Sequence, residues 1–267
     1  MAERPHPYLA LAVAQVRSQA SYRMSFWMDL AGNLFVLSAD LLALLIMFRI
    51  TDDLGGFSRP QVLVMFGISA VAFALADLSV GNIERVRAYI RTGTLDTVLV
   101  RPLGVLGQLL ALDFSIRRLS RVLYAIAILT VALRSAQVSW TPSKALLLVV
   151  AVLAGAVFFG ALFVATATVA FWWIESGELG NIVTYGGRDF TSYPISIYGA
   201  WFRRLFGFVL GLGFVAYYPA LALLGLPDPA GLPDWTGWVA PAAAPVAAAV
   251  SALIWRTGVR HYRSTGS

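Results

Sequence analysis

Three aspartates, Asp29, Asp40 and Asp77, stand within or beside long apolar runs of the chain. An ionisable group is costly to place inside a membrane, so each is a candidate for chemistry. Two carboxylates that share a proton could serve an intramembrane protease, and a single buried acid could relay protons. Asp29 and Asp77 fall near the ends of their runs, which leaves Asp40 as the deepest. The simpler expectation is that these acids face neighbouring helices or a water-filled vestibule.

Other side chains limit the chemistry further. The chain has no cysteine, which excludes disulfides, a thiol nucleophile and a thiolate metal site. Its two histidines, His6 and His261, stand near opposite ends of the chain, so we expect no histidine-based metal site. A phosphate-binding loop requires a Gly-Lys pair, and the one lysine, Lys144, follows Pro142 and Ser143. We therefore expect no metal, no cofactor and no ATP hydrolysis in this chain itself.

The elements that position these residues are predicted by composition. Hydrophobic residues make up 59% of the 267 residues and charged residues 13%, against about 25% charged in soluble domains. We expect an all-α integral membrane protein, since a spanning helix needs about 20 apolar residues. Residues 1–26 form an amphipathic helix suited to the membrane interface, followed by one membrane domain, 27–267. Its six transmembrane helices are expected at 27–48, 61–80, 119–138, 145–174, 205–224 and 238–255, with 175–204 as loop and short helices.

The basic residues predict the orientation of these spans. Six spans place sixteen basic residues, including Arg188, Arg203 and Arg204, on the side that carries both termini, and four on the other. Basic residues collect on the cytoplasmic side of membrane proteins. The N and C termini are therefore expected to be cytoplasmic. The net charge of +6 then needs no nucleic-acid partner to explain it.

Small residues indicate close helix packing. Gly207 and Gly211 form a GxxxG pair in the fifth expected span, where small residues let helices approach closely in lipid. Packing within the subunit and a dimer interface are both compatible with this spacing.

The connection at residues 81–118 is longer than two neighbouring spans require. Gly93 breaks its first helical stretch, and Thr94 is expected to cap a second short helix with an apolar face that includes Leu95. The pair Arg101-Pro102 then ends this second helix. A short basic helix of this kind could dock into a groove of a soluble partner, or could lie on anionic lipid headgroups. The residues alone leave both uses open.

The same connection carries a family resemblance. The stretch Tyr89-Ile90-Arg91-Thr92-Gly93-Thr94-Leu95-Asp96-Thr97-Val98-Leu99-Val100-Arg101-Pro102 resembles the Ile-Arg-x-Gly-x-Leu-Asp-x-x-Leu-x-Arg-Pro segment of bacterial ABC exporter permeases of the type-2 class, in their short six-span subgroup. Two supporting segments are Phe190 to Tyr198, leading to Tyr218-Pro219-Ala220, and the tail Gly258 to Ser267.

This resemblance implies a permease subunit of an ATP-driven exporter in the bacterial inner membrane. It implies two partners besides the lipid bilayer: a second permease, identical or homologous, and cytosolic ATPase subunits that bind ATP and Mg²⁺. The loop 81–118 would hold the coupling helix, with Arg91, Gly93, Leu95, Asp96, Arg101 and Pro102 as its docking residues. Asp40, Asp77, Gly207 and Gly211 are candidates for the translocation path or for helix packing. The alternatives are a proton-coupled secondary transporter and an intramembrane enzyme, either of which would use Asp40 and Asp77.

Overall fold

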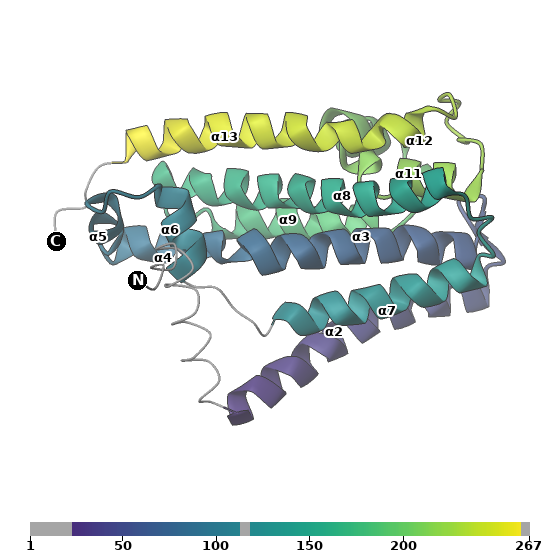
Figure 1. The fold of residues 1–267 in the computed structure, drawn as a ribbon, viewed down its shortest axis with the longest axis horizontal. Helices are drawn as coiled ribbons and strands as arrows, with labels where there is room; N and C mark the ends of the chain where they lie inside the picture. Colours follow the sequence, from purple (N-terminus) through teal and green to yellow (C-terminus); the bar gives the residue numbers. More distant parts are fainter. Residues whose placement is uncertain (1–22, 113–117, 263–267) are drawn as a thin grey trace, which may run out of the picture.

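The computed structural model describes residues 23–112 and 118–262, which form a bundle of helices and one two-stranded hairpin. The long helices α2 (Arg23–Ile50), α3 (Arg59–Val80), α7 (Leu119–Ser135), α8 (Pro142–Thr168), α9 (Gly177–Thr191) and α13 (Ala243–His261) run roughly along one axis (Figure 1). The hairpin pairs β1 (Asp53–Leu54) with β2 (Phe57–Ser58) and connects α2 to α3. Most of the expected interfacial helix, residues 1–22, lies outside the described part of the chain.

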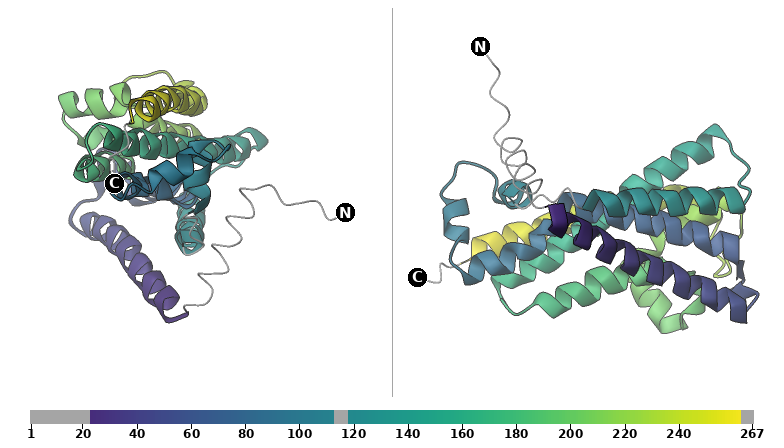
Figure 2. Two further views of the ribbon diagram at one scale, coloured as in Figure 1. Left: turned by 90° about the vertical axis from the view of Figure 1, so that its left-hand side faces the viewer. Right: turned by 90° about the horizontal axis from the view of Figure 1, so that it is seen from below.

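The centre of the bundle is α3, which packs against α7 and α8, while α13 packs on the other side of α8. Small residues allow these close approaches. A Cβ added to Gly67 of α3 would lie 2.9 Å from Leu129 Cα of α7, and one added to Gly155 of α8 would lie 2.8 Å from Ala72 Cβ of α3. The helix α2 lies at the edge, splayed from the rest, and contacts α7 (Figure 2).

Three of the helical stretches in the described ranges are long and apolar enough to cross a membrane: Arg59–Arg91, Pro142–Phe171 and Thr236–His261. They match the second, fourth and sixth expected spans. The first and third expected spans correspond to α2, 28 residues long, and α7, 17 residues long. At 1.5 Å per residue, these helices extend about 42 Å and about 26 Å, against a hydrocarbon core of about 30 Å.

The region of the fifth expected span, 205–224, differs from the expectation of one continuous helix. It consists of α10 (Ala200–Phe202), the π-helix η5 (Arg203–Val209), the 3-10 turn η6 (Leu212–Phe214) and α11 (Tyr217–Leu224). The two limbs meet at an angle of 68°. Gly211 lies between them with φ +76°, a left-handed conformation that glycine adopts without a steric cost. Both limbs stay at the hairpin end of the bundle, where Phe57 and Tyr217 place their ring centroids 5.8 Å apart.

The segment 175–204 also differs, because most of it is the helix α9 rather than loop. This helix runs antiparallel to α8 (Figure 1): Gly180 faces Thr166, and Gly187 faces Leu162. A single turn, η4 (Ile195–Ile197), then reaches the hairpin, where Ser196 Oγ donates a hydrogen bond of 2.8 Å to the Gly55 carbonyl. The chain therefore crosses the length of the bundle through α9. The two limbs Ala200–Val209 and Leu212–Leu224, which we call the bent pair, lie at the hairpin end.

This path changes the distribution of charge. Arg188 lies inside the bundle, and Arg203 and Arg204 of the bent pair lie at the hairpin end. The prediction that these three residues lie on the side of the two termini was therefore wrong. The other end keeps a larger basic set among the described residues: Arg85, Arg87, Arg91, Arg101, Arg118, Arg121, Arg256 and Arg260. The hairpin end holds Arg49, Arg59, Arg134, Lys144, Arg203 and Arg204. The asymmetry is smaller than the sequence predicted, but it has the same sign.

Candidate functional site

The basic end of the bundle is covered by a group of short helices. They are η1 (Gly81–Arg85), α4 (Val86–Arg91), α5 (Leu95–Leu99) and α6 (Val105–Leu112). Gly93 makes the turn between α4 and α5 with φ +69°. The helix α5 follows Thr94 as expected, but Thr94 does not cap it. Its hydroxyl instead lies 2.8 Å from the Thr92 hydroxyl.

The helix α5 is held from two directions. Leu95 and Val98 face inward and are buried. The buried amide of Gln108, on α6, donates hydrogen bonds to the carbonyls of Val98 at 3.1 Å and Leu103 at 2.9 Å. From the other side Tyr262, just after α13, donates from Oη to Asp96 Oδ1 at 3.0 Å. A displacement of α5 would therefore move α6 and α13 as well.

The six residues expected to dock a partner occupy different environments. Arg101 and Pro102 are exposed, as are Thr97 and Val100 beside them, and Val100 is 82% exposed. Leu95 is fully buried, so it supports the surface from within. Asp96 is half-buried against Tyr262, Gly93 forms the turn, and the exposed Arg91 side chain pairs with Glu175. The outward surface of this region is therefore Thr97, Val100, Arg101 and Pro102, which we call the α5 surface.

The helix α4 contacts the junction between α8 and α9. Arg91 pairs with Glu175, and the Arg87 guanidinium lies directly against Gly177, the first residue of α9. The pair of Arg91 and Glu175 is exposed, with side chains 62% and 72% accessible, so it contributes about 0–1 kcal/mol. The pair matters for the position of α9, because the turn that begins α9 rests on α4.

Asp77 is the buried acid at the basic end of α3. Its carboxylate, 3% exposed, accepts from Arg118 Nη1 at 2.9 Å and from Arg121 Nη1 at 2.7 Å. Both arginines come from the beginning of α7, so the three residues join α3 to α7. A carboxylate enclosed in this way has both of its oxygens occupied by arginine.

Asp40 and Arg188 form a second ion pair, deeper in the bundle, between α2 and α9. The guanidinium of Arg188 also lies 5.5 Å from the ring centroid of Phe73 on α3. Nearby, Ser38 of α2 and Tyr124 of α7 are hydrogen-bonded at 2.8 Å. The pairs Asp40–Arg188 and Asp77–Arg118/Arg121 are separate, so the structure does not bring the two acids together as a carboxylate dyad.

The helix α9 exposes a row of polar side chains on one face, beside the exposed apolar side chains of Leu179 and Ile182. Glu178, Asn181, Tyr185 and Asp189 are exposed along it. Its buried residues are Phe190 and three small or hydroxyl-bearing residues, Thr184, Gly187 and Thr191. Thr191 Oγ1 lies 2.6 Å from Ser69 Oγ of α3. Glu178, Asn181, Tyr185 and Asp189 of α9, together with Asp40 of α2, form a polar strip that we call the polar wall.

The helix α9 was not predicted from the sequence, because its glycines and the following Pro194 are typical of a loop. The signal that could have identified it is the spacing of Gly180, Thr184, Gly187 and Thr191, which places small side chains on one helical face. Gly207 and Gly211, by contrast, do not share a helical face, since Gly211 is the break between the two limbs. In the described ranges, no three His, Cys, Asp or Glu side chains are grouped as they would be around a metal ion.

The chain was compared with models of known protein families. A family model described as ABC-2 family transporter protein matches residues 34–266. The chain belongs to this family. No curated protein and no solved structure matches it. Membership in the ABC-2 family makes the chain a multi-pass membrane component of a transporter, and it confirms the resemblance found at residues 89–102.

Proposed function

We propose that this ABC-2 protein is the permease subunit of an ATP-driven exporter in a bacterial inner membrane. Two such subunits, identical or homologous, form the translocation path. Separate cytosolic ATPase subunits bind ATP and Mg²⁺ and dock on the α5 surface. Both termini are cytoplasmic, and the six crossings are α2, α3, α7, α8, α9 and α13, with the bent pair at 200–224 as a re-entrant element at the outer end.

The observation that carries this proposal is the way α5 is connected. Val100 and Arg101, which directly follow α5, are exposed, while the inward contacts of α5 reach α6 and, through Tyr262, α13. The preceding helix α4 supports the start of α9 through Arg87 and Gly177. A partner that moves when it binds ATP could thus displace α9 and α13 without touching the membrane-embedded part.

The polar wall of α9 and α2 is the proposed lining of the path. Polar groups at membrane depth are stable where they face water or a partner helix rather than lipid. Asp40, Arg188 and the exposed polar residues of α9 satisfy this condition if a second permease subunit packs across the wall. Asp77 has a different role in this proposal, because both of its oxygens are held by arginines of α7.

The test is co-purification with an ATPase from the native membrane. The mildly solubilised wild-type chain should bring down a protein with nucleotide-binding motifs, and Val100→Asp with Arg101→Glu should abolish that association. Arg260→Glu is the matched control, because Arg260 is also exposed at the basic end but lies on α13. Leu95 is unsuitable, since a charge at a fully buried position would disrupt the fold. Wild-type chain without any ATPase, or a double variant that retains it, would refute the proposal.

A further inference from the structure

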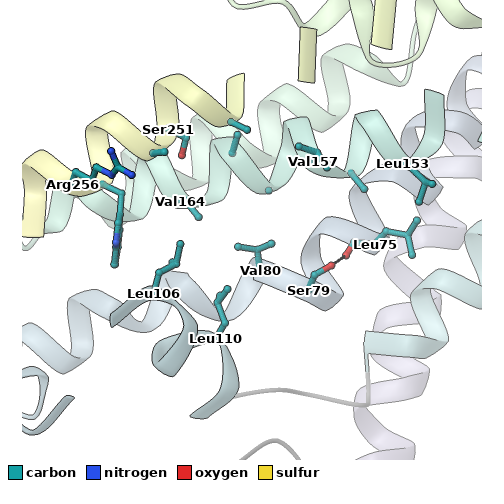
Figure 3. A pocket seen from close by; sticks show the side chains of 16 residues that line it. Leu75, Ser79, Val80, Leu106, Leu110, Leu153, Val157, Val164, Ser251 and Arg256 are labelled. Atoms are coloured by element: carbon teal, nitrogen blue, oxygen red, sulfur yellow. Dashed lines mark hydrogen bonds between the residues drawn. The ribbon is translucent and has the colours of Figure 1, made fainter. Parts of the chain in front are cut away.

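A groove of about 610 Å³ lies on the side of the bundle formed by α3, α6, α8 and α13. Its lining is apolar apart from Ser79, Ser251 and Arg256 (Figure 3). Ser79 Oγ is bonded to the Leu75 carbonyl. Ser251 differs, because its hydroxyl is buried and has no hydrogen-bond partner in the described ranges.

The groove has the length of one bilayer leaflet. Along α8 its lining extends from Leu153 to Val164, which is about 16 Å at 1.5 Å per residue, or roughly half of a 30 Å hydrocarbon core. Leu153 and Arg256 lie at opposite ends of the groove (Figure 3). The Arg256 end is the one that faces α6 and the basic end of the bundle. The groove therefore extends from the middle of the bundle to the basic end.

The residues around the groove indicate that it opens toward lipid. Leu153 and Val157 of α8 are 55% and 50% exposed, and Leu253 of α13 is 62% exposed. An apolar groove that is left empty loses the dispersion contacts of its lining atoms. In a membrane, the acyl chain of a lipid can supply those contacts.

The polar groups at one end identify the headgroup. Arg256 is exposed, and within the described ranges it forms no ion pair. No acidic residue lines the groove. Ser251 lies one and a half turns deeper on α13, about 7.5 Å along the helix axis. A phosphodiester beside Arg256 would place its glycerol ester carbonyls below it, at about the depth of Ser251.

We propose that this groove holds one anionic phospholipid of the inner leaflet, with an acyl chain between α8 and α3, its phosphate at Arg256 and its ester carbonyls at about the depth of Ser251. This lipid connects α13 to α6, the helix that holds α5 in place through Gln108. The assignment to the inner leaflet rests on the orientation given in the proposed function, but lipid binding itself requires neither an ATPase nor transport.

The experiment counts the lipids that stay bound to the chain. Full-length protein is reconstituted into vesicles of equal phosphatidylglycerol and phosphatidylcholine, re-extracted in mild detergent, and weighed by native mass spectrometry. The wild type should retain one phospholipid per chain, predominantly phosphatidylglycerol. Ala252→Trp fills the groove and should lower retention about tenfold. Ala249→Trp is the control, because Ala249 is exposed on the same helix but does not line the groove.

A second pair of variants tests the headgroup. Arg256→Gln should keep a lipid but lose the preference for phosphatidylglycerol, whereas Arg260→Gln should behave as the wild type. Equal retention by Ala252→Trp and Ala249→Trp would overturn the inference, as would an unchanged preference in Arg256→Gln. Loss of a dimer mass in Ala252→Trp, without loss of lipid, would show instead that a second copy of the chain occupies the groove.

Discussion

The substitution Asp77→Asn tests whether the buried acid of α3 has a structural role. The carboxylate is 3% exposed and is bonded to Arg118 and Arg121 at 2.9 and 2.7 Å. Replacing it by a neutral amide leaves two arginines close together without the carboxylate that binds both, and the neighbouring Glu84 offsets only part of their charge. Removing one partner of a buried ion pair costs about 3–5 kcal/mol. The arginine side chains are 20% and 26% exposed, so water screens part of the repulsion. We therefore expect the lower limit, about 3 kcal/mol.

The partner substitution makes the prediction specific. Arg121→Gln leaves Asp77 paired with Arg118 and should cost less, about 1 kcal/mol. In the double variant Asp77→Asn/Arg121→Gln only one unpaired arginine remains, and it is partly exposed. The double variant should therefore be more stable than the sum of the two single changes predicts, by about 1–2 kcal/mol.

The assay is reversible unfolding in mixed micelles with increasing SDS mole fraction, followed by circular dichroism. Asp234→Asn is the control, because Asp234 is exposed in the loop before α12 and should change stability by less than about 0.5 kcal/mol. Wild-type stability in Asp77→Asn, or strict additivity in the double variant, would refute the structural role. Asp77 would then again be a candidate for carrying protons.

Three further predictions concern α5, the polar wall and the bent pair. Burial, and next the hydrogen bond to Asp96, raises the pKa of Tyr262 above its ordinary value of 10.0. The native state therefore keeps this proton where the unfolded chain loses it, so stability should fall as the pH rises beyond 10. Tyr262→Phe should remove this dependence and, at pH 7, accelerate amide exchange in α5 about fivefold, corresponding to about 1 kcal/mol. Vesicles with the purified wild-type chain and vesicles with Asp40→Asn should show the same proton uptake. A loss of proton uptake in Asp40→Asn would favour a proton-coupled transporter. Gly211→Ala should lower the free energy of unfolding by about 1–2 kcal/mol in the same SDS titration, because Ala disfavours φ +76°; an unchanged value would show that the break can relax.

The amino-acid sequence was sufficient to predict the helices that are apolar on most sides. The runs that became α3, α8 and α13 were identified with ends within about six residues of those observed, because a helix surrounded by lipid or by other helices is continuously apolar. The turn at Gly93 and the helix after Thr94 were also predicted, since glycine and the following apolar spacing are local signals. In each case, the information lies within about 20 neighbouring residues.

The failures involve residues whose partners are distant in sequence. Arg188 was placed in a loop because a charge within a glycine-rich segment resembles solvent-exposed chain, yet Asp40 and Phe73, far away in sequence, surround it. Leu95 was expected on a docking face, but no local signal distinguishes an apolar side chain that faces a partner from one that faces α6. The break at Gly211 was read as a packing motif, because GxxxG has the same spacing in a straight helix and at a bend.

The position of α9 bears on how a small movement at α5 could reach the proposed transport path. A long apolar helix can slide or tilt in lipid only as a unit, since its backbone hydrogen bonds are all internal. The helix α9 is short, rich in glycine, and begins at the turn that rests on Arg87 and Arg91 of α4. At its other end Thr191 is bonded to Ser69 of the central helix α3. A displacement of α4 would thus act on the beginning of α9, while the end of α9 stays bonded to α3. The polar face of α9, which includes Tyr185 and Asp189, would then tilt relative to α2. The pair Arg91–Glu175 and the side chain of Arg87 are both exposed, so the packing of α4 against α8 and the turn Val169–Phe171 must share in transmitting the movement.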